Sequence, residues 1–329
     1  MKQEEIIPQL VEKELITSDQ FEEVKNYRVL GVFSLHNELL FLLYLSVLLF
    51  TTGIGTLIYK NIDSIGHGFV LALLFLMTIA CFYFSFKKAK GFSREDVDFE
   101  NPVYNYLVLT ATILSCIFVG YLQFQYQIFG NNYSWATLFS AMISFGVAYY
   151  FNNKSALSIA ITGLVTTIGI SLTPKDLLEN EIYSNPMLSY SGLVLGVLLL
   201  VWDHYSKTIN LKKHFSLVFL TFALHLISIC CIAGLLEDYW FMFVFVMAGF
   251  TYYFYKISYE IKAISIFTFT ILYSYIGFNI TLFKLFDLVD LNFFGEFFII
   301  LTPFYFIGSI VGFIQLIKHF NKKSHDSIQ

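Results

Sequence analysis

The chain has 329 residues, of which 57% are hydrophobic and only 13% are charged, and its formal net charge at pH 7 is -4. About a quarter of the residues of a typical soluble domain are charged, so this composition excludes a soluble globular protein and indicates one that lies in a lipid bilayer. Because the net charge is slightly negative and the basic residues are scattered, we expect no nucleic acid partner.

The first 38 residues form a polar arm that precedes the first long apolar stretch. Apolar side chains between Ile6 and Leu15 recur at helical spacing, and residues 17–20 are typical of the start of a second helix. We therefore predict a cytosolic helical hairpin over residues 1–38. Two short helices cannot bury enough apolar surface to be stable alone, so this hairpin packs on its own membrane domain, self-associates or binds a partner protein.

Ten apolar stretches follow the arm, and each is about long enough to cross the hydrocarbon layer as a helix. They lack the alternation of apolar and polar residues that the strands of a membrane barrel show. We predict an all-α, polytopic membrane bundle over residues 39–317, followed by a basic tail at 318–329. The predicted spans are 39–59, 69–86, 104–124, 133–151, 155–172, 187–202, 215–235, 239–255, 261–283 and 294–317.

The positions of the cations predict how the spans are oriented. With the N-terminus in the cytosol, seventeen of the twenty Lys and Arg residues lie on the cytosolic side, and only Lys60, Lys175 and Lys284 lie outside. Cations are retained on the cytosolic side of short loops, so this partition predicts that both termini are cytosolic.

Two segments near the N-terminus suggest a family. The run Leu10-Val11-Glu12-Lys13-Glu14-Leu15-Ile16-Thr17-Ser18-Asp19-Gln20-Phe21 precedes a first span that contains Thr51-Thr52-Gly53-Ile54-Gly55. This combination resembles the bacterial predicted membrane proteins grouped as domain of unknown function 2157. The resemblance implies a cytosolic hairpin with a many-span bundle in a bacterial cytoplasmic (inner) membrane. It implies no catalytic residues, because the activity of that family is not established.

A few residues inside the spans are candidates for a ligand or proton site. His225 lies in the middle of a span between Leu224 and Leu226, where a polar group is costly and usually faces the bundle or a water-filled cavity. A neutral imidazole with one hydrogen bond to a neighbouring helix also fits this position. Pro303 is expected to kink the last span, and Gly53 and Gly55 to loosen the first, as in the interrupted helices of transporter sites.

Other small residues indicate helix packing. Gly192 and Gly196, like Gly308 and Gly312, have the spacing that lets two membrane helices approach closely. The four cysteines lie inside spans without companion histidines, so we interpret them as small apolar side chains and expect neither a metal site nor another cofactor.

Three classes of function are compatible with these features. The first is a carrier or ligand-binding protein for a solute or lipid, which the number of spans, the interrupted helices and His225 favour. The second is a membrane scaffold or signalling component that binds partners through residues 1–38. The third is an intramembrane enzyme, but no HExxH, GxSxG or paired carboxylates occur in mid-span, so we assign no catalytic residue. We favour the first class.

Overall fold

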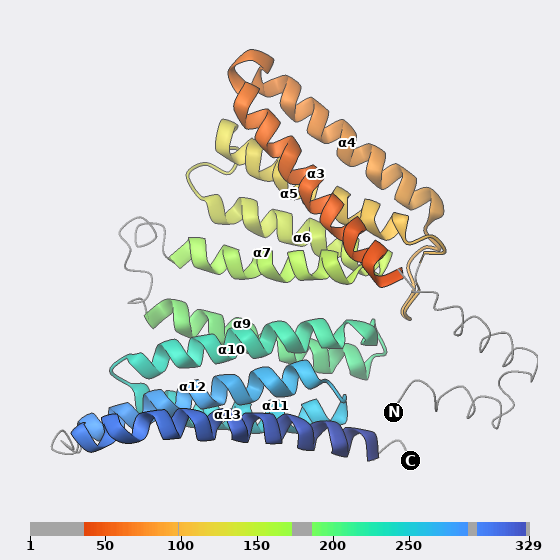
Figure 1. Cartoon of the computed structure of the whole chain (residues 1–329). Helices are drawn as coiled ribbons and strands as arrows, with labels where there is room; N and C mark the ends of the chain where they lie inside the picture. The colour runs from red at the N-terminus through yellow and green to blue at the C-terminus, as the bar shows by residue number, and fades with distance from the viewer. Residues whose placement is uncertain (1–35, 98, 173–185, 289–294, 327–329) are drawn as a thin grey trace, which may run out of the picture. The chain divides into compact units, whose positions relative to one another are not determined.

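The computed structural model describes residues 36–97, 99–172, 186–288 and 295–326. These residues form ten α-helices and one short 3-10 helix, and no strand occurs in the described ranges (Figure 1). The predicted hairpin lies almost entirely outside the described residues. The α-helices are α3 (His36–Ile65), α4 (His67–Lys88), α5 (Val103–Tyr126), α6 (Tyr133–Phe151), α7 (Lys154–Leu172), α9 (Pro186–Thr208), α10 (Ser216–Leu236), α11 (Trp240–Glu260), α12 (Ile264–Leu288) and α13 (Gly295–Asp326).

Each predicted span has one of these helices, so the all-α membrane fold is confirmed. Nine helices are long and apolar enough to cross a bilayer among the described residues. The tenth, α6, has the predicted bounds, but three serines and three tyrosines among its 19 residues lower its mean hydropathy. At the other end of the chain, α13 continues to Asp326, through most of the segment that we predicted as a tail.

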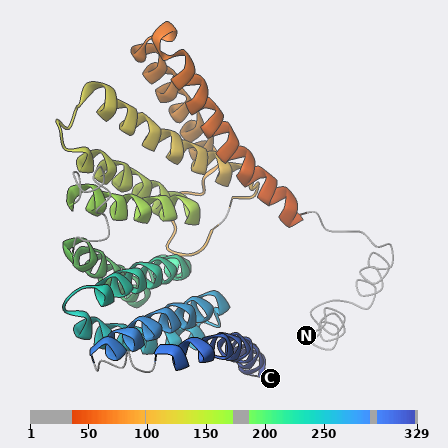
Figure 2. The same cartoon turned by 60° about the vertical axis from the view of Figure 1, so that its left-hand side comes forward.

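Packing divides the chain into two units, Met1–Thr56 and Leu57–Gln329, and the boundary lies within α3. In the second unit, helices that follow one another along the chain pack as antiparallel pairs. The pairs are α4 with α5, α6 with α7, α9 with α10, and α11 with α12 (Figures 1 and 2). Three of these four pairs have short connections, which favour this arrangement because a chain that leaves one helix end returns alongside it, whereas residues 89–102 between α4 and α5 form a longer one.

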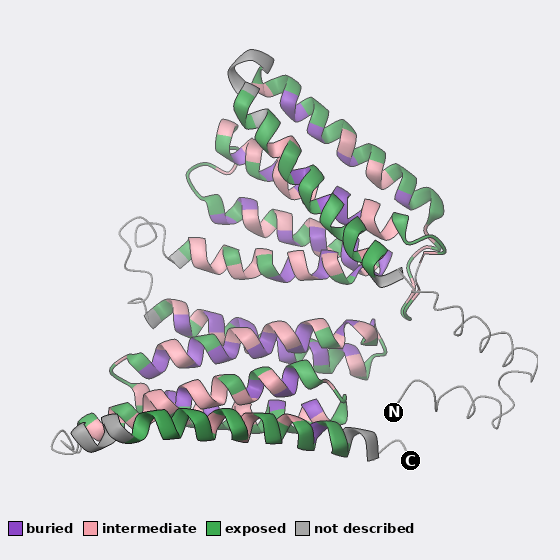
Figure 3. Ribbon diagram, viewed as in Figure 1, coloured by how far each residue is buried: buried purple, intermediate pink, exposed green. Residues whose placement is uncertain are grey.

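Helix α10 is the best-buried element of the second unit. It packs against α7, α9, α11 and α12, and about half of its 21 residues are buried. Figure 3 shows many buried residues on α10, whereas the described side chains of α13 are exposed along most of its length. Because lipid is as apolar as the bundle, close van der Waals contact between small side chains rather than water exclusion stabilises such a core.

The glycine pair on α9 lies where two helices approach closely. A Cβ added to Gly192 would lie 2.5 Å from the Cys230 sulfur, and one added to Gly196 would lie 2.5 Å from Ile227 Cγ1. Both positions on α9 therefore need glycine for the contact with α10. On α13 the surroundings differ, because a Cβ at Gly308 or Gly312 meets no described atom within 4 Å.

Candidate functional site

Three connections meet at one end of the bundle, the end that the positions of the cations predict to be cytosolic. They are residues 89–102 between α4 and α5, residues 152–153 between α6 and α7, and residues 209–212 after α9. The Asn152 amide donates hydrogen bonds to the carbonyls of Glu95 (3.0 Å) and Val97 (3.2 Å), and the Lys212 backbone N–H donates to the Arg94 carbonyl (2.9 Å). We call this cluster the loop node, comprising residues 92–97 with Asn152, Lys154, Lys212 and His214.

Lys212 is the central side chain of the loop node. It is fully buried, its ammonium donates a hydrogen bond to Asn152 Oδ1, and its Nζ lies 4.9 Å above the centre of the Phe92 ring. Burial disfavours the charged form and lowers the pKa of Lys212 to about 8, although the negative charge of Asp96 acts in the opposite direction. A buried ammonium with defined partners fixes the geometry of the loops around it.

Asp96 lies close to two further side chains of this cluster, Lys154 and His214. One carboxylate oxygen lies 3.3 Å from Lys154 Nζ, and the other lies 3.6 Å from His214 Nε2. Asp96 and Lys154 are both about half exposed, so their ion pair contributes little to stability. The loop node therefore depends mainly on Asn152 and Lys212.

The second polar region lies within the membrane-spanning part, around His225 of α10. His225 Nδ1 is 2.9 Å from the hydroxyl of Tyr273 on α12, and the imidazole ring packs edge-on against Phe269, 4.7 Å between ring centres. This is the interhelical hydrogen bond that a structural role for His225 requires. A role of His225 in binding a ligand or a proton stays a prediction.

A groove with a volume of about 430 Å³ runs between α11 and α12, and neither His225 nor Tyr273 lines it. Tyr252 and Phe278 at its rim are 71% and 58% exposed, so among the described residues the groove opens on the surface of the bundle. None of the residues that line it is charged. They are Val244, Met247, Ala248, Thr251, Tyr252, Tyr255, Ser274, Gly277, Phe278 and Thr281.

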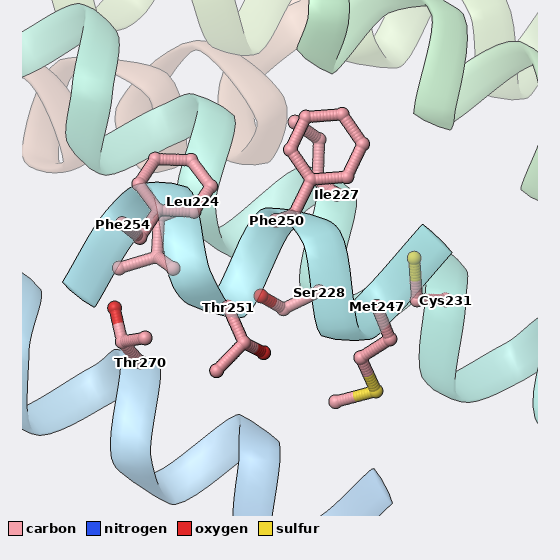
Figure 4. Close-up of a pocket in the computed structure, with 9 residues that line it drawn as sticks. All are labelled: Leu224, Ile227, Ser228, Cys231, Met247, Phe250, Thr251, Phe254 and Thr270. Atoms are coloured by element: carbon pink, nitrogen blue, oxygen red, sulfur yellow. The ribbon is translucent and has the colours of Figure 1, made fainter. Parts of the chain in front are cut away.

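Hydroxyl groups line this groove and a small gap next to it. The gap has room for about one water molecule, and Figure 4 shows Ser228 of α10, Thr251 of α11 and Thr270 of α12 around it. Thr251 lines both spaces. Thr270 donates a hydrogen bond to a carbonyl of its own helix, as Thr281 does, but Ser228, Thr251 and Ser274 have no hydrogen bond to any described residue.

Of the candidate residues that the sequence suggested, only His225 lies on a helix that borders one of these spaces, α10, and it lines neither the groove nor the gap. Pro303 lies within the continuous helix α13, is exposed and does not line the groove. Gly53 and Gly55 belong to the first unit, on the uninterrupted helix α3. No group of three or more His, Cys, Asp or Glu side chains that could hold a metal ion occurs in the described part of the chain.

Sequence reasoning missed the two features that the structure makes most distinctive. Lys212 was recognised only as one cation of a basic loop, because a sequence does not reveal which lysine of a group is buried. Thr251 and Ser274 were missed because serine and threonine are common in membrane helices, where most bond to their own backbone.

The N-terminal part of the chain matches a known family. Residues 8–157 match the family described as Predicted membrane protein (DUF2157), and the match covers α3 to α6 in full. No match to this chain was found among curated proteins or among solved structures. The resemblance of residues 10–21 and 51–55 is thereby confirmed, and the chain is a membrane protein of many helices whose residues 8–157 match that family.

Proposed function

We propose that this chain is a ligand-binding, carrier-like protein of the bacterial cytoplasmic membrane, and that its ligand enters the groove between α11 and α12 from the bilayer. The observation that carries this proposal is the pair of hydroxyls of Thr251 and Ser274, which line an uncharged groove and have no hydrogen bond to any described residue. A volume of about 430 Å³ lies within the range of sites for small molecules.

The physical reason is the cost of an unbonded polar group away from water. In lipid, serine and threonine hydroxyls usually donate to their own helix, and a hydroxyl that lacks a partner has lost favourable free energy. A ligand with a polar atom in the groove would supply that partner. Its apolar part would cover the rim residues Tyr252 and Phe278, which face the lipid.

Filling the groove tests this proposal. Ala248 is exposed and lines the groove, so Ala248→Trp places an indole where the ligand would lie. Gly249→Trp is the matched control, because Gly249 is the next residue, does not line the groove, and an added Cβ there meets no described atom within 4 Å.

The measurement is thermal unfolding of the purified protein in detergent with hexadecan-1-ol, hexadecyl phosphate, hexadecane and a bacterial lipid extract. We expect at least one of these to raise the Tm of the wild type and of Gly249→Trp but not that of Ala248→Trp, since a ligand stabilises the folded state to which it binds. If no addition distinguishes the two variants, the groove is not a binding site and the proposal is wrong.

A scaffold role through residues 1–38 stays a prediction. The hairpin that would carry it lies almost entirely outside the described residues.

A further inference from the structure

We propose that the groove between α11 and α12 selects an uncharged lipid with a single long apolar chain, whose alcohol or carbonyl oxygen binds Thr251 and Ser274. This inference rests on the proposed function and adds the chemical class of the ligand. Three properties of the groove support it: the absence of charge from its lining, the depth of its hydroxyls and its shape.

The absence of charge from the lining favours a ligand with an uncharged head group. All ten lining residues are uncharged. The nearest cations along the two helices are Lys256 and Lys284, and both have other partners. Lys256 lies 3.8 Å from Glu260, and Lys284 donates a hydrogen bond to the Leu236 carbonyl. A phosphate or carboxylate at Thr251 would be about 7 Å along the helix axis from Lys256, given a rise of about 1.5 Å per residue, and would lack an opposite charge.

The depth of the two hydroxyls in the bilayer also favours an uncharged ligand. Thr251 is close to the middle of α11 (Trp240–Glu260), and Ser274 is close to the middle of α12 (Ile264–Leu288). A charged group at the centre of a bilayer is costly, whereas an alcohol or a carbonyl reaches this depth at far lower cost. The two hydroxyls can donate to a carbonyl oxygen, or both donate to and accept from an alcohol.

The shape of the groove determines how many chains it can take. Its lining on α11 runs from Val244 to Tyr255, which is about 16 Å along the helix axis. It is a single seam between two helices, and Gly277 forms its floor, since a Cβ there would lie 2.3 Å from the Met247 sulfur. From Thr251 to Val244 the lining is about 10 Å long, so the seam takes the first part of one extended chain whose polar atom lies near Thr251 and Ser274, and the rest of the chain lies in the bilayer.

Hexadecan-1-ol, hexadecyl phosphate and hexadecane test this selectivity, because they share one chain and differ only in the head group. Their affinities would be measured by competition against a fluorescent long-chain alcohol in the wild type and in the double variant Thr251→Val, Ser274→Ala. These substitutions keep the size of the side chains, and the Tm without ligand shows whether the double variant is folded.

We expect hexadecan-1-ol to bind about tenfold more tightly than the other two compounds, and to lose this advantage in the double variant, as expected for two hydrogen bonds. Binding of hexadecyl phosphate as tight as that of the alcohol, or an unchanged affinity in the double variant, would overturn the inference. If such binding were still lost in Ala248→Trp, the proposed function would stand. If Ala248→Trp changes the affinity of none of the three compounds, both this inference and the proposed function are wrong.

Discussion

The loop node and the groove are both polar regions of one helical bundle, yet their polar groups are used in opposite ways. In the loop node, the Asn152 side chain bonds two carbonyls and the buried ammonium of Lys212. In the groove, the hydroxyls of Thr251 and Ser274 have no hydrogen bond to any described residue. The bonded side chains of the loop node hold the connections in place. The unused hydroxyls of the groove support the proposal that it binds a ligand.

The largest expected effect comes from breaking the loop node at Asn152. Asn152→Ala leaves the Lys212 ammonium buried without its acceptor and removes the bonds to Glu95 and Val97. We expect a loss of about 3 kcal/mol in the free energy of unfolding, since removing one partner of a buried charge is strongly destabilising. Denaturant unfolding in mild detergent would measure it.

Asn210→Ala is the control for this variant. Asn210 has the same left-handed backbone conformation (φ 53°, against 59° for Asn152) but is exposed. The free energy of unfolding should fall by about 1 kcal/mol or less in Asn210→Ala, which is the cost of placing alanine in that conformation. Equal losses in the two variants would show that the side-chain bonds of Asn152 contribute nothing.

The second-largest expected effect is a dependence of the free energy of unfolding on pH. The pKa of Lys212 is lowered from 10.5 to about 8, so between these values the unfolded chain binds a proton that the folded protein has released. The free energy of unfolding of the wild type should therefore rise relative to that of Lys212→Met as the pH increases from 7 to 10, by on the order of 2 kcal/mol. This difference in the free energy of unfolding between the wild type and Lys212→Met should fall again as the pH drops through 8. A difference between the two proteins that stays constant over this range would contradict a buried, titrating Lys212.

A smaller effect is expected at His225. Tyr273→Phe removes only the hydroxyl that bonds the imidazole, and hydrogen bonds between membrane helices contribute about 0.6 to 2 kcal/mol. Tyr83→Phe, at an exposed position of α4, is the control and should have no measurable effect. His225→Leu should likewise leave the protein folded. If it also abolishes stabilisation by the alcohol, His225 belongs to the ligand site, and if not, His225 has a structural role alone.

The smallest effect is expected in the groove. Thr251→Val should change the free energy of unfolding without ligand by less than about 0.5 kcal/mol, because no hydrogen bond to a described residue is lost. Thermal unfolding with and without hexadecan-1-ol would measure both the stability and the response to ligand. A loss above about 1 kcal/mol in the absence of ligand would show that the hydroxyl is already bonded in the folded protein.

Much of the fold could be predicted from the sequence, because membrane helices follow from the length and polarity of single segments. All ten helices lie where apolar stretches predicted them, and α6 matches residues 133–151 at both ends. The orientation of the termini stays a prediction, since nothing in the helices tests it.

The sites were harder to predict, because they depend on which side chains meet. His225 could be recognised from its depth in a span, but its partner Tyr273 is 48 residues away. Lys212 and Asn152 are 60 residues apart and come together only through the packing of three hairpins. The groove depends on Gly277 and on small side chains such as Ala248, which are ordinary in any membrane helix.

The most direct test of the central claim is to map where an alcohol binds. The wild type, Ala248→Trp and Gly249→Trp would be reconstituted in liposomes with a photoreactive hexadecan-1-ol, irradiated, digested and examined by mass spectrometry. We predict labelling concentrated on residues 244–255 and 274–281, retained in Gly249→Trp and lost in Ala248→Trp. Labelling spread evenly over exposed helices such as α4 and α13, and unaffected by Ala248→Trp, would contradict a binding site in the groove.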